Sequence, residues 1–124
     1  MRLLIDTHVV VWLAADKRRL TDRVLRALSD NPGDVSVSVI SAWEYEMKRR
    51  KQPDRFPIAF DTVISAAGFY RLDFPFACHK DAEALPYIHR DPFDRMLIAH
   101  ARYLQCPLVT SDSAIMQYPV ETIW

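Results

Sequence analysis

The chain has 124 residues, of which 50% are hydrophobic, and this size suits one compact α/β domain, residues 1–124, rather than two. Its 16 Lys and Arg balance 16 Asp and Glu, so no global basic field marks it for nucleic acid, although a local basic patch stays open. Only Gly33 and Gly68 are glycines. Their scarcity excludes the Walker phosphate loop, the dinucleotide-binding fingerprint and the nucleophile elbow, each of which needs closely spaced glycines.

Cysteines and apolar runs indicate the compartment. Cys78 and Cys106 form no CxxC pair and have apolar neighbours, so we expect reduced core thiols rather than a disulfide. The longest apolar run, Val9–Ala15, is too short to cross a bilayer and is a poor signal peptide. The expected protein is soluble and cytoplasmic, with no membrane association.

Hydrophobic periodicity and Gly/Pro punctuation predict the elements. In chain order they are a strand at 2–5, an ambiguous segment at 9–15, a helix from the N-cap Thr21 to Ser29, a strand at 35–40, helices at 41–51 and 58–67, a strand at 70–72, a short helix at 79–85, a long helix at 92–104, a strand at 108–110 and an edge strand at 120–123. Valines favour a strand in the ambiguous segment, whereas its Trp-Leu-Ala-Ala end favours a helix. The alternation predicts an α/β fold, a three-layer α/β/α arrangement with a mostly parallel central sheet.

Acidic residues follow several of these strands. Asp6 comes directly after the first strand, Glu44 lies one helical turn beyond the second, and Asp112 lies just past the fourth. Asp94 opens the long helix. Because the carboxyl ends of parallel strands meet at one edge, these carboxylates are expected to converge. Clustered carboxylates need a cation, and an all-oxygen set suits Mg²⁺ or Mn²⁺ rather than zinc.

Most of these acids also have a purely structural interpretation. Ser41 and Glu44 have the spacing of a capping box. Asp91 and Asp94 fit the N-cap and third position of the long helix, and Asp112 fits the cap of the turn that follows it. The metal hypothesis therefore depends on the convergence of all four acids.

Four segments of the chain resemble known motifs. Residues 4–8 (LIDTH) resemble the opening of PIN-domain proteins, and residues 38–44 (SVISAWE) resemble their second acidic motif. Residues 89–99 (HRDPFDRMLIA) resemble the third motif in the VapC-like toxin branch, and residues 108–112 (LVTSD) resemble the fourth. Together the four segments extend from residue 4 to residue 112, almost the whole chain, and they follow the family's order.

This resemblance implies a doubly wound sheet with a helix after Asp6, and an Mg²⁺- or Mn²⁺-dependent endoribonuclease. It also implies the toxin of a type II toxin–antitoxin pair, inhibited by a cognate antitoxin protein and commonly a homodimer. Asp6, Glu44, Asp94 and Asp112 would be the metal-binding catalytic acids. Asp91 would act first as a helix cap and second as an outer-sphere helper.

The expected chemistry is metal-assisted hydrolysis of an RNA phosphodiester bond. Arg90 and Arg95 flank the acids of the third motif and could contact phosphates. The hydroxyl of Thr110 or of Ser111 would line the site. For the basic run at 48–51 we expect a solvated helix end, with contact to RNA or antitoxin as the alternative.

Histidines and aromatic residues invite other interpretations. The four histidines lack paired-ligand spacing, so zinc is disfavoured, and His100 is expected to be a packing residue. Trp12, Trp43 and Phe93 are expected in the core, although Trp12 could line a groove for an antitoxin segment.

Three rival functions remain. A receiver domain needs paired acids after the first strand and a late lysine, and a dehalogenase-like phosphatase needs Asp-x-Asp, but the chain has Asp6-Thr7-His8. A non-catalytic PIN-like module that binds RNA or a partner is the more serious alternative. The presence of all four acids argues against it.

Overall fold

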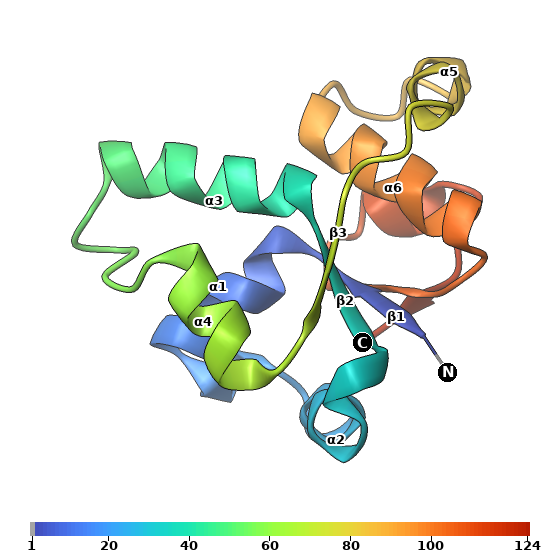
Figure 1. The fold of residues 1–124 in the computed structure, drawn as a ribbon. Helices are drawn as coiled ribbons and strands as arrows, with labels where there is room; N and C mark the ends of the chain where they lie inside the picture. The colour runs from blue at the N-terminus through green and yellow to red at the C-terminus, as the bar shows by residue number, and fades with distance from the viewer. Residues whose placement is uncertain (1) are drawn as a thin grey trace.

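A parallel sheet forms the centre of the computed structural model, which describes residues 2–124 (Figure 1). Its order is β3-β2-β1-β4-β5, and every pair of neighbours is parallel. The strands are β1 (Leu3–Ile5), β2 (Val35–Ser38), β3 (Tyr70–Leu72), β4 (Leu108–Val109) and β5 (Thr122–Ile123). The mostly parallel sheet predicted from the sequence is confirmed.

Helices connect the strands. They are α1 (Thr7–Ala15), α2 (Asp22–Asp30), α3 (Val39–Lys51), α4 (Phe60–Ala67), α5 (Cys78–Ala84) and α6 (Pro92–Leu104). The ambiguous segment at 9–15 lies in helix α1, where Val9 and Val10 are fully buried. Tertiary packing therefore overrides the strand preference of its valines. No helix within residues 2–124 is long and apolar enough to cross a membrane.

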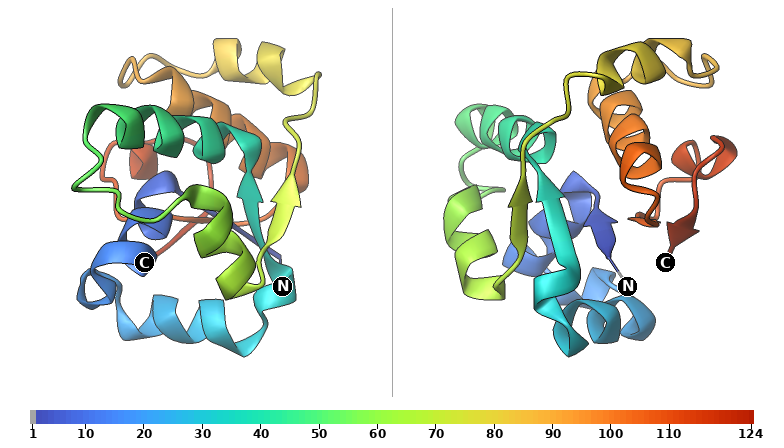
Figure 2. Two further views of the ribbon diagram at one scale, coloured as in Figure 1. Left: turned by 60° about the vertical axis from the view of Figure 1, so that its left-hand side comes forward. Right: turned by 45° about the vertical axis from the view of Figure 1, so that its right-hand side comes forward.

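Apolar side chains fill both faces of the sheet. Successive residues of β1 point to opposite faces, so Leu3 and Ile5 join a core cluster with α1, α2 and α4, whereas Leu4 joins the cluster beneath α6. Figure 2 shows the sheet between these helical layers. The predicted three-layer α/β/α architecture is confirmed.

Helix α3 begins two residues earlier than the sequence suggested. The hydroxyl of Ser38 accepts a hydrogen bond from the Ile40 backbone N–H (3.1 Å) and caps the helix, so β2 ends at Ser38. Ser41 then lies inside the helix, and the predicted capping box between Ser41 and Glu44 is wrong. Glu44 is consequently released from capping and is buried at the sheet edge.

Two predictions about individual side chains have opposite outcomes. Cys78 and Cys106 are buried free thiols, as expected. Trp43 is 59% exposed and is not a core residue, and its ring packs edge-on against Phe93 at the start of α6. Trp12 and Phe93 are partly buried and pack against the core clusters.

Candidate metal centre

The four acids singled out in the sequence lie at the carboxyl edge of the sheet. Asp6 follows β1, Asp112 follows β4, Glu44 lies on α3 just beyond β2, and Asp94 lies in the first turn of α6. Asp6, Glu44 and Asp94 are buried, and Asp112 is half-buried. The right-handed crossovers of a parallel sheet place these segments together although they are distant in sequence.

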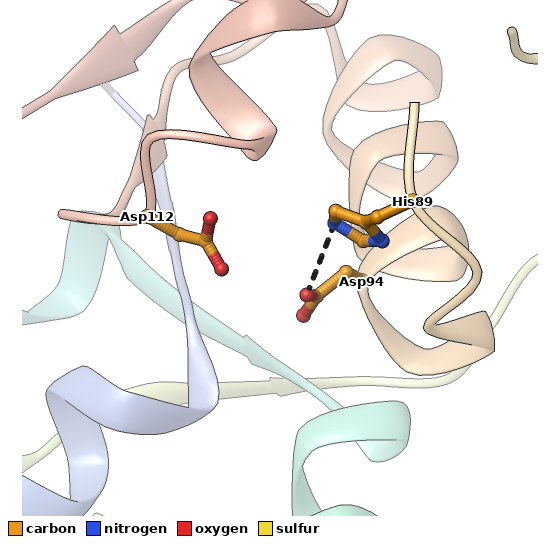
Figure 3. Close-up of side chains that lie close together, drawn as sticks. All are labelled: His89, Asp94 and Asp112. Carbon is orange, nitrogen blue, oxygen red and sulfur yellow. Dashed lines mark ion pairs between the residues drawn. The ribbon is translucent and has the colours of Figure 1, made fainter. Parts of the chain in front are cut away.

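Asp94 and Asp112 form the tightest part of this site, together with His89. One ligand atom from each of the three residues lies within 4.8 Å of the other two. Figure 3 shows Asp112 reaching from the loop after β4 toward Asp94, in the first turn of α6, and toward His89, in the segment before that helix. Asp6 and Glu44 border this group without joining it.

The pKa of Asp94 shows the electrostatic cost of bringing these acids together. Its pKa is raised to about 8, first by burial and then by the negative charges of Asp91, Asp6, Glu44 and Asp112. A carboxyl group surrounded by other carboxylates in a poorly solvated site is destabilised in its ionised form. A bound cation would reverse that penalty.

Asp6 is held rigidly from two sides. Its Oδ1 accepts a hydrogen bond from the His8 backbone N–H (3.2 Å) and caps α1, and its Oδ2 accepts one from the Thr110 hydroxyl (2.7 Å). Burial acts to raise the pKa of Asp6, but the hydrogen bonds from His8 and Thr110 outweigh it and the pKa is lowered. Asp6 is therefore kept ionised next to Asp94.

Glu44 is fixed by neighbours on two helices. The Thr7 hydroxyl donates to Glu44 Oε1 (2.6 Å) and lies 3.1 Å from the Ser41 hydroxyl. Lys48 Nζ donates to Glu44 Oε2 (3.0 Å) from one turn further along α3. Thr7 is thus both the first residue of α1 and a support for Glu44.

Asp91 caps helix α6 with its side chain, whereas Asp112 uses only one of its two side-chain oxygens for capping. Asp91 Oδ1 accepts from the backbone N–H groups of Phe93 and Asp94, as the helix-cap prediction required. Asp112 Oδ1 accepts from the backbone N–H groups of Ala114 and Ile115, and its Oδ2 makes no hydrogen bond within residues 2–124. That oxygen remains available to a ligand.

The donor set fits a divalent cation. The Nε2 atom of His89 is buried and has no hydrogen-bond partner among residues 2–124, although it lies 3.4 Å from Asp94 Oδ2. His89 Nδ1 accepts a hydrogen bond from the Asp91 backbone N–H (3.2 Å), so Nε2 carries the ring proton and faces the Asp94 carboxylate as a donor. The metal ligands are therefore the carboxylates, and an all-oxygen set favours Mg²⁺ or Mn²⁺.

Sequence reasoning missed His89 because it lies in the irregular segment between α5 and α6, where no periodicity indicates which way a side chain points. Its position in the same motif as Asp94, five residues earlier, was the available signal. His100 behaves as expected. It is buried, its Nδ1 lies 3.0 Å from the Ser38 hydroxyl, and burial lowers its pKa to about 4.

Two expected substrate contacts are corrected. Arg95 is only 6% exposed and its guanidinium stacks over the Tyr87 ring, 4.3 Å from the centroid. It donates to the backbone carbonyls of Ala82, Glu83, Leu85 and Pro86. Because these carbonyls use its donors, Arg95 ties the end of α5 to α6 instead of contacting phosphate.

Thr110 is the second correction. It is fully buried, so its hydroxyl cannot reach substrate and instead supports Asp6, while the neighbouring Ser111 is exposed. Arg90 is exposed beside the site and stays available to a phosphate.

A carboxylate-lined site at the carboxyl edge of the sheet places this chain among the parallel α/β proteins that bind ligands at that edge. The comparisons with known proteins identify the family. Residues 3–120 match the model of the PIN domain, so the chain belongs to the PIN-domain family.

Solved structures share the fold. A chain of the VapBC2 complex from Rickettsia felis, bound to a DNA fragment from its promoter, is similar with a TM-score of 0.77 and 16% identity, over 99% of this chain and 98% of that one. A chain of DNA-bound VapBC from Salmonella typhimurium is similar with a TM-score of 0.75 and 17% identity, over 99% and 97%. No curated protein matches the sequence significantly.

Proposed function

We propose that this protein is a metal-dependent endoribonuclease that hydrolyses RNA phosphodiester bonds, and that it is the toxin of a type II toxin–antitoxin pair. The observation that carries the proposal is the gathering of four acids at the carboxyl edge of the sheet, where ligand atoms of Asp94 and Asp112 lie within 4.8 Å of one another. Membership of the PIN-domain family over residues 3–120 supports the same chemistry.

Asp94 and Asp112 would hold Mg²⁺ or Mn²⁺, with Asp6 and Glu44 completing the charge of the site and His89 positioning the Asp94 carboxylate. When bound, such an ion activates water and offsets negative charge on phosphate. The protein's own groups prepare this site. Thr110 keeps Asp6 ionised through a 2.7 Å hydrogen bond.

Thr7 and Lys48 position the acid at the other border of the site, because they fix both oxygens of Glu44. Asp91 fixes the first turn of α6, which carries Asp94. Arg90 is the exposed cation placed to pair with a substrate phosphate.

The partner proteins follow from the same reasoning. The two solved relatives are VapBC complexes, and their fold covers almost the whole of this chain. A small antitoxin is therefore the expected partner, and a homodimer is the expected assembly. A short neighbouring reading frame that encodes a DNA-binding protein would support the toxin assignment.

Incubation of the purified protein with RNA tests the activity. We expect cleavage with Mg²⁺ or Mn²⁺, none with EDTA, and none for Asp6→Asn. Asparagine still caps a helix and still accepts a hydrogen bond, so this variant removes the charge while keeping the fold, which circular dichroism would verify.

The matched control is Asp61→Asn, an exposed acid in the first turn of α4 that should cleave like wild type. Cleavage that survives in Asp6→Asn and still needs metal would reject the site assignment. A folded, metal-binding protein that cuts no RNA would indicate the non-catalytic PIN-like binding module.

A further inference from the structure

A groove with a volume of about 730 Å³ lies beside the metal centre, between α1 and the C-terminal half of α3. The loop after α3 closes its far side. We call it the α1–α3 groove. It is lined by His8, Val11, Trp12, Ala15, Asp16, Arg19, Lys48, Lys51, Gln52, Asp54, Arg55 and Phe56.

The groove lies next to the metal centre, since two of its lining residues contact the site acids directly. His8 Nδ1 lies 3.7 Å from Asp6 Oδ1, and Lys48 Nζ lies 3.0 Å from Glu44 Oε2. A polymer with one backbone group at the acids would therefore have this groove beside it.

Cations outnumber acids along the groove. Arg19, Lys51 and Arg55 are exposed side chains of its lining, and a fourth cation, Lys48, is paired with Glu44 at 3.0 Å. The opposing acids are Asp16 and Asp54. Asp16 is also paired with Arg18, which is not part of the lining, at 3.1 Å, so its charge is partly compensated. The net charge of the lining favours a polyanion.

The floor of the groove is apolar and aromatic. Trp12 packs edge-on against Trp124 (5.6 Å between ring centroids) and lies 5.8 Å from the His8 ring. The Arg19 guanidinium lies 5.2 Å over the Trp12 ring. Aromatic surface beneath a row of cations is the combination that holds single-stranded nucleic acid, because phosphates pair with the cations and bases lie against the rings.

We propose that the α1–α3 groove binds the RNA strand that extends from the scissile phosphate, with Lys51 and Arg55 pairing with its backbone phosphates. This inference rests on the proposed ribonuclease function and adds the route of the substrate. The basic end of α3 is then a binding surface and not merely a solvated helix end.

The test compares two substrates on the folded, full-length protein with Mn²⁺. A dinucleotide offers a single phosphodiester bond to the metal centre and has no phosphates for the groove. A single-stranded oligoribonucleotide of about a dozen nucleotides is long enough to occupy both the metal centre and the α1–α3 groove. The variant is the double charge reversal Lys51→Glu with Arg55→Glu.

For the oligonucleotide, we expect kcat/KM of this variant to fall roughly 10- to 100-fold and the slope of log affinity against log salt to lose about 1.4, the value for two single-strand phosphate contacts. Dinucleotide cleavage should stay near the wild-type rate. The matched control reverses Arg23 and Arg26 on α2, exposed residues outside the groove, and should cleave both substrates normally.

Unchanged cleavage of the oligonucleotide by the variant would overturn the proposal and would favour a protein segment as the ligand of the groove. An equal loss on both substrates would also overturn it, because the damage would then lie at the metal centre. If wild type cleaves neither substrate, the ribonuclease function itself fails. Should the charge reversals prevent folding, Lys51→Gln with Arg55→Gln replaces them, with a smaller loss on the oligonucleotide alone.

Discussion

Replacing Asp94 by Asn should stabilise the metal-free protein, which is unusual for a buried site. Burial and the neighbouring carboxylates raise the pKa of Asp94 to about 8 in the folded chain, from its ordinary value of 3.8. The folded state therefore binds a proton that the unfolded state releases between these pH values, so the free energy of unfolding falls as pH rises from about 4 to about 8. At pH 7 this penalty is about 4 kcal/mol, from roughly three pH units at 1.36 kcal/mol each.

At pH 7 folded Asp94 is mostly protonated, and asparagine mimics this neutral side chain without the cost of taking up a proton. We therefore expect Asp94→Asn to gain about 2–4 kcal/mol at pH 7 in EDTA, a rise in Tm of roughly 10 °C. At pH 5 the gain should shrink to about 1 kcal/mol, because only about one pH unit then separates the solution from the unfolded pKa. Thermal unfolding at both pH values measures it.

Added Mn²⁺ should narrow this difference. A ligand at 100 times its dissociation constant stabilises the folded state by about 2.7 kcal/mol, and wild type should gain this while Asp94→Asn gains less. Asp61→Asn, the exposed first-turn acid of α4, serves as the control and should show neither effect. If Asp94→Asn melts at or below the wild-type temperature in EDTA at pH 7, the proposed crowding of charge around Asp94 is refuted.

Three further predictions concern residues that support the site and the fold. Thr110→Val should lower the rate of RNA cleavage by roughly 10- to 100-fold, because Asp6 loses its 2.7 Å hydrogen-bond donor. Thr110→Ser keeps the hydroxyl and should retain activity, and a titration of the cleavage rate against Mn²⁺ distinguishes the two variants. Arg95→Met should lower the free energy of unfolding in urea by about 3 kcal/mol or more, because four backbone carbonyls lose their hydrogen-bond donor. Arg90→Met should keep the free energy of unfolding within about 0.5 kcal/mol of wild type and should weaken RNA binding. Burial lowers the pKa of His100 to about 4 from its ordinary value of 6.5, so about 3 kcal/mol of stability should be lost as pH falls from about 6.5 to 4 and the unfolded state takes up a proton. His100→Asn should flatten this pH dependence of the unfolding free energy, whereas the exposed His79→Gln should not.

Each of these predictions can fail in a distinct way. Equal activity for Thr110→Val and Thr110→Ser would mean that the hydroxyl does not support Asp6. A fully stable Arg95→Met that loses RNA binding would restore Arg95 as a phosphate contact. An unchanged pH profile in His100→Asn would show that another buried group controls acid unfolding.

The position of the acids could be predicted because it depends on topology. Asp6 and Asp112 directly follow strands that the apolar pattern identified, and parallel strands share one carboxyl edge. The helix at 7–15 could not be derived from local preference, since its valines favour a strand and only packing of Val9 and Val10 against the sheet decides. The family resemblance supplied that element instead.

The finer roles could not be derived because they depend on which side chain is buried. Arg95 and Arg90 flank the same motif, but one lies under the end of α5 and the other in solvent. Thr110 and Ser111 likewise differ only in the direction their side chains take at the end of β4. His89 reaches Asp94 through an irregular segment, for which sequence spacing gives no orientation.

The most direct measurement is an anomalous difference map from a crystal of this protein soaked in Mn²⁺. The account predicts a peak at coordinating distance from the carboxylates of Asp94 and Asp112, beside Asp6, Glu44 and His89, and its absence in Asp94→Asn crystals treated in the same way. A wild-type map with no peak there, or with the acids closed over one another in the presence of Mn²⁺, would contradict the existence of the metal centre.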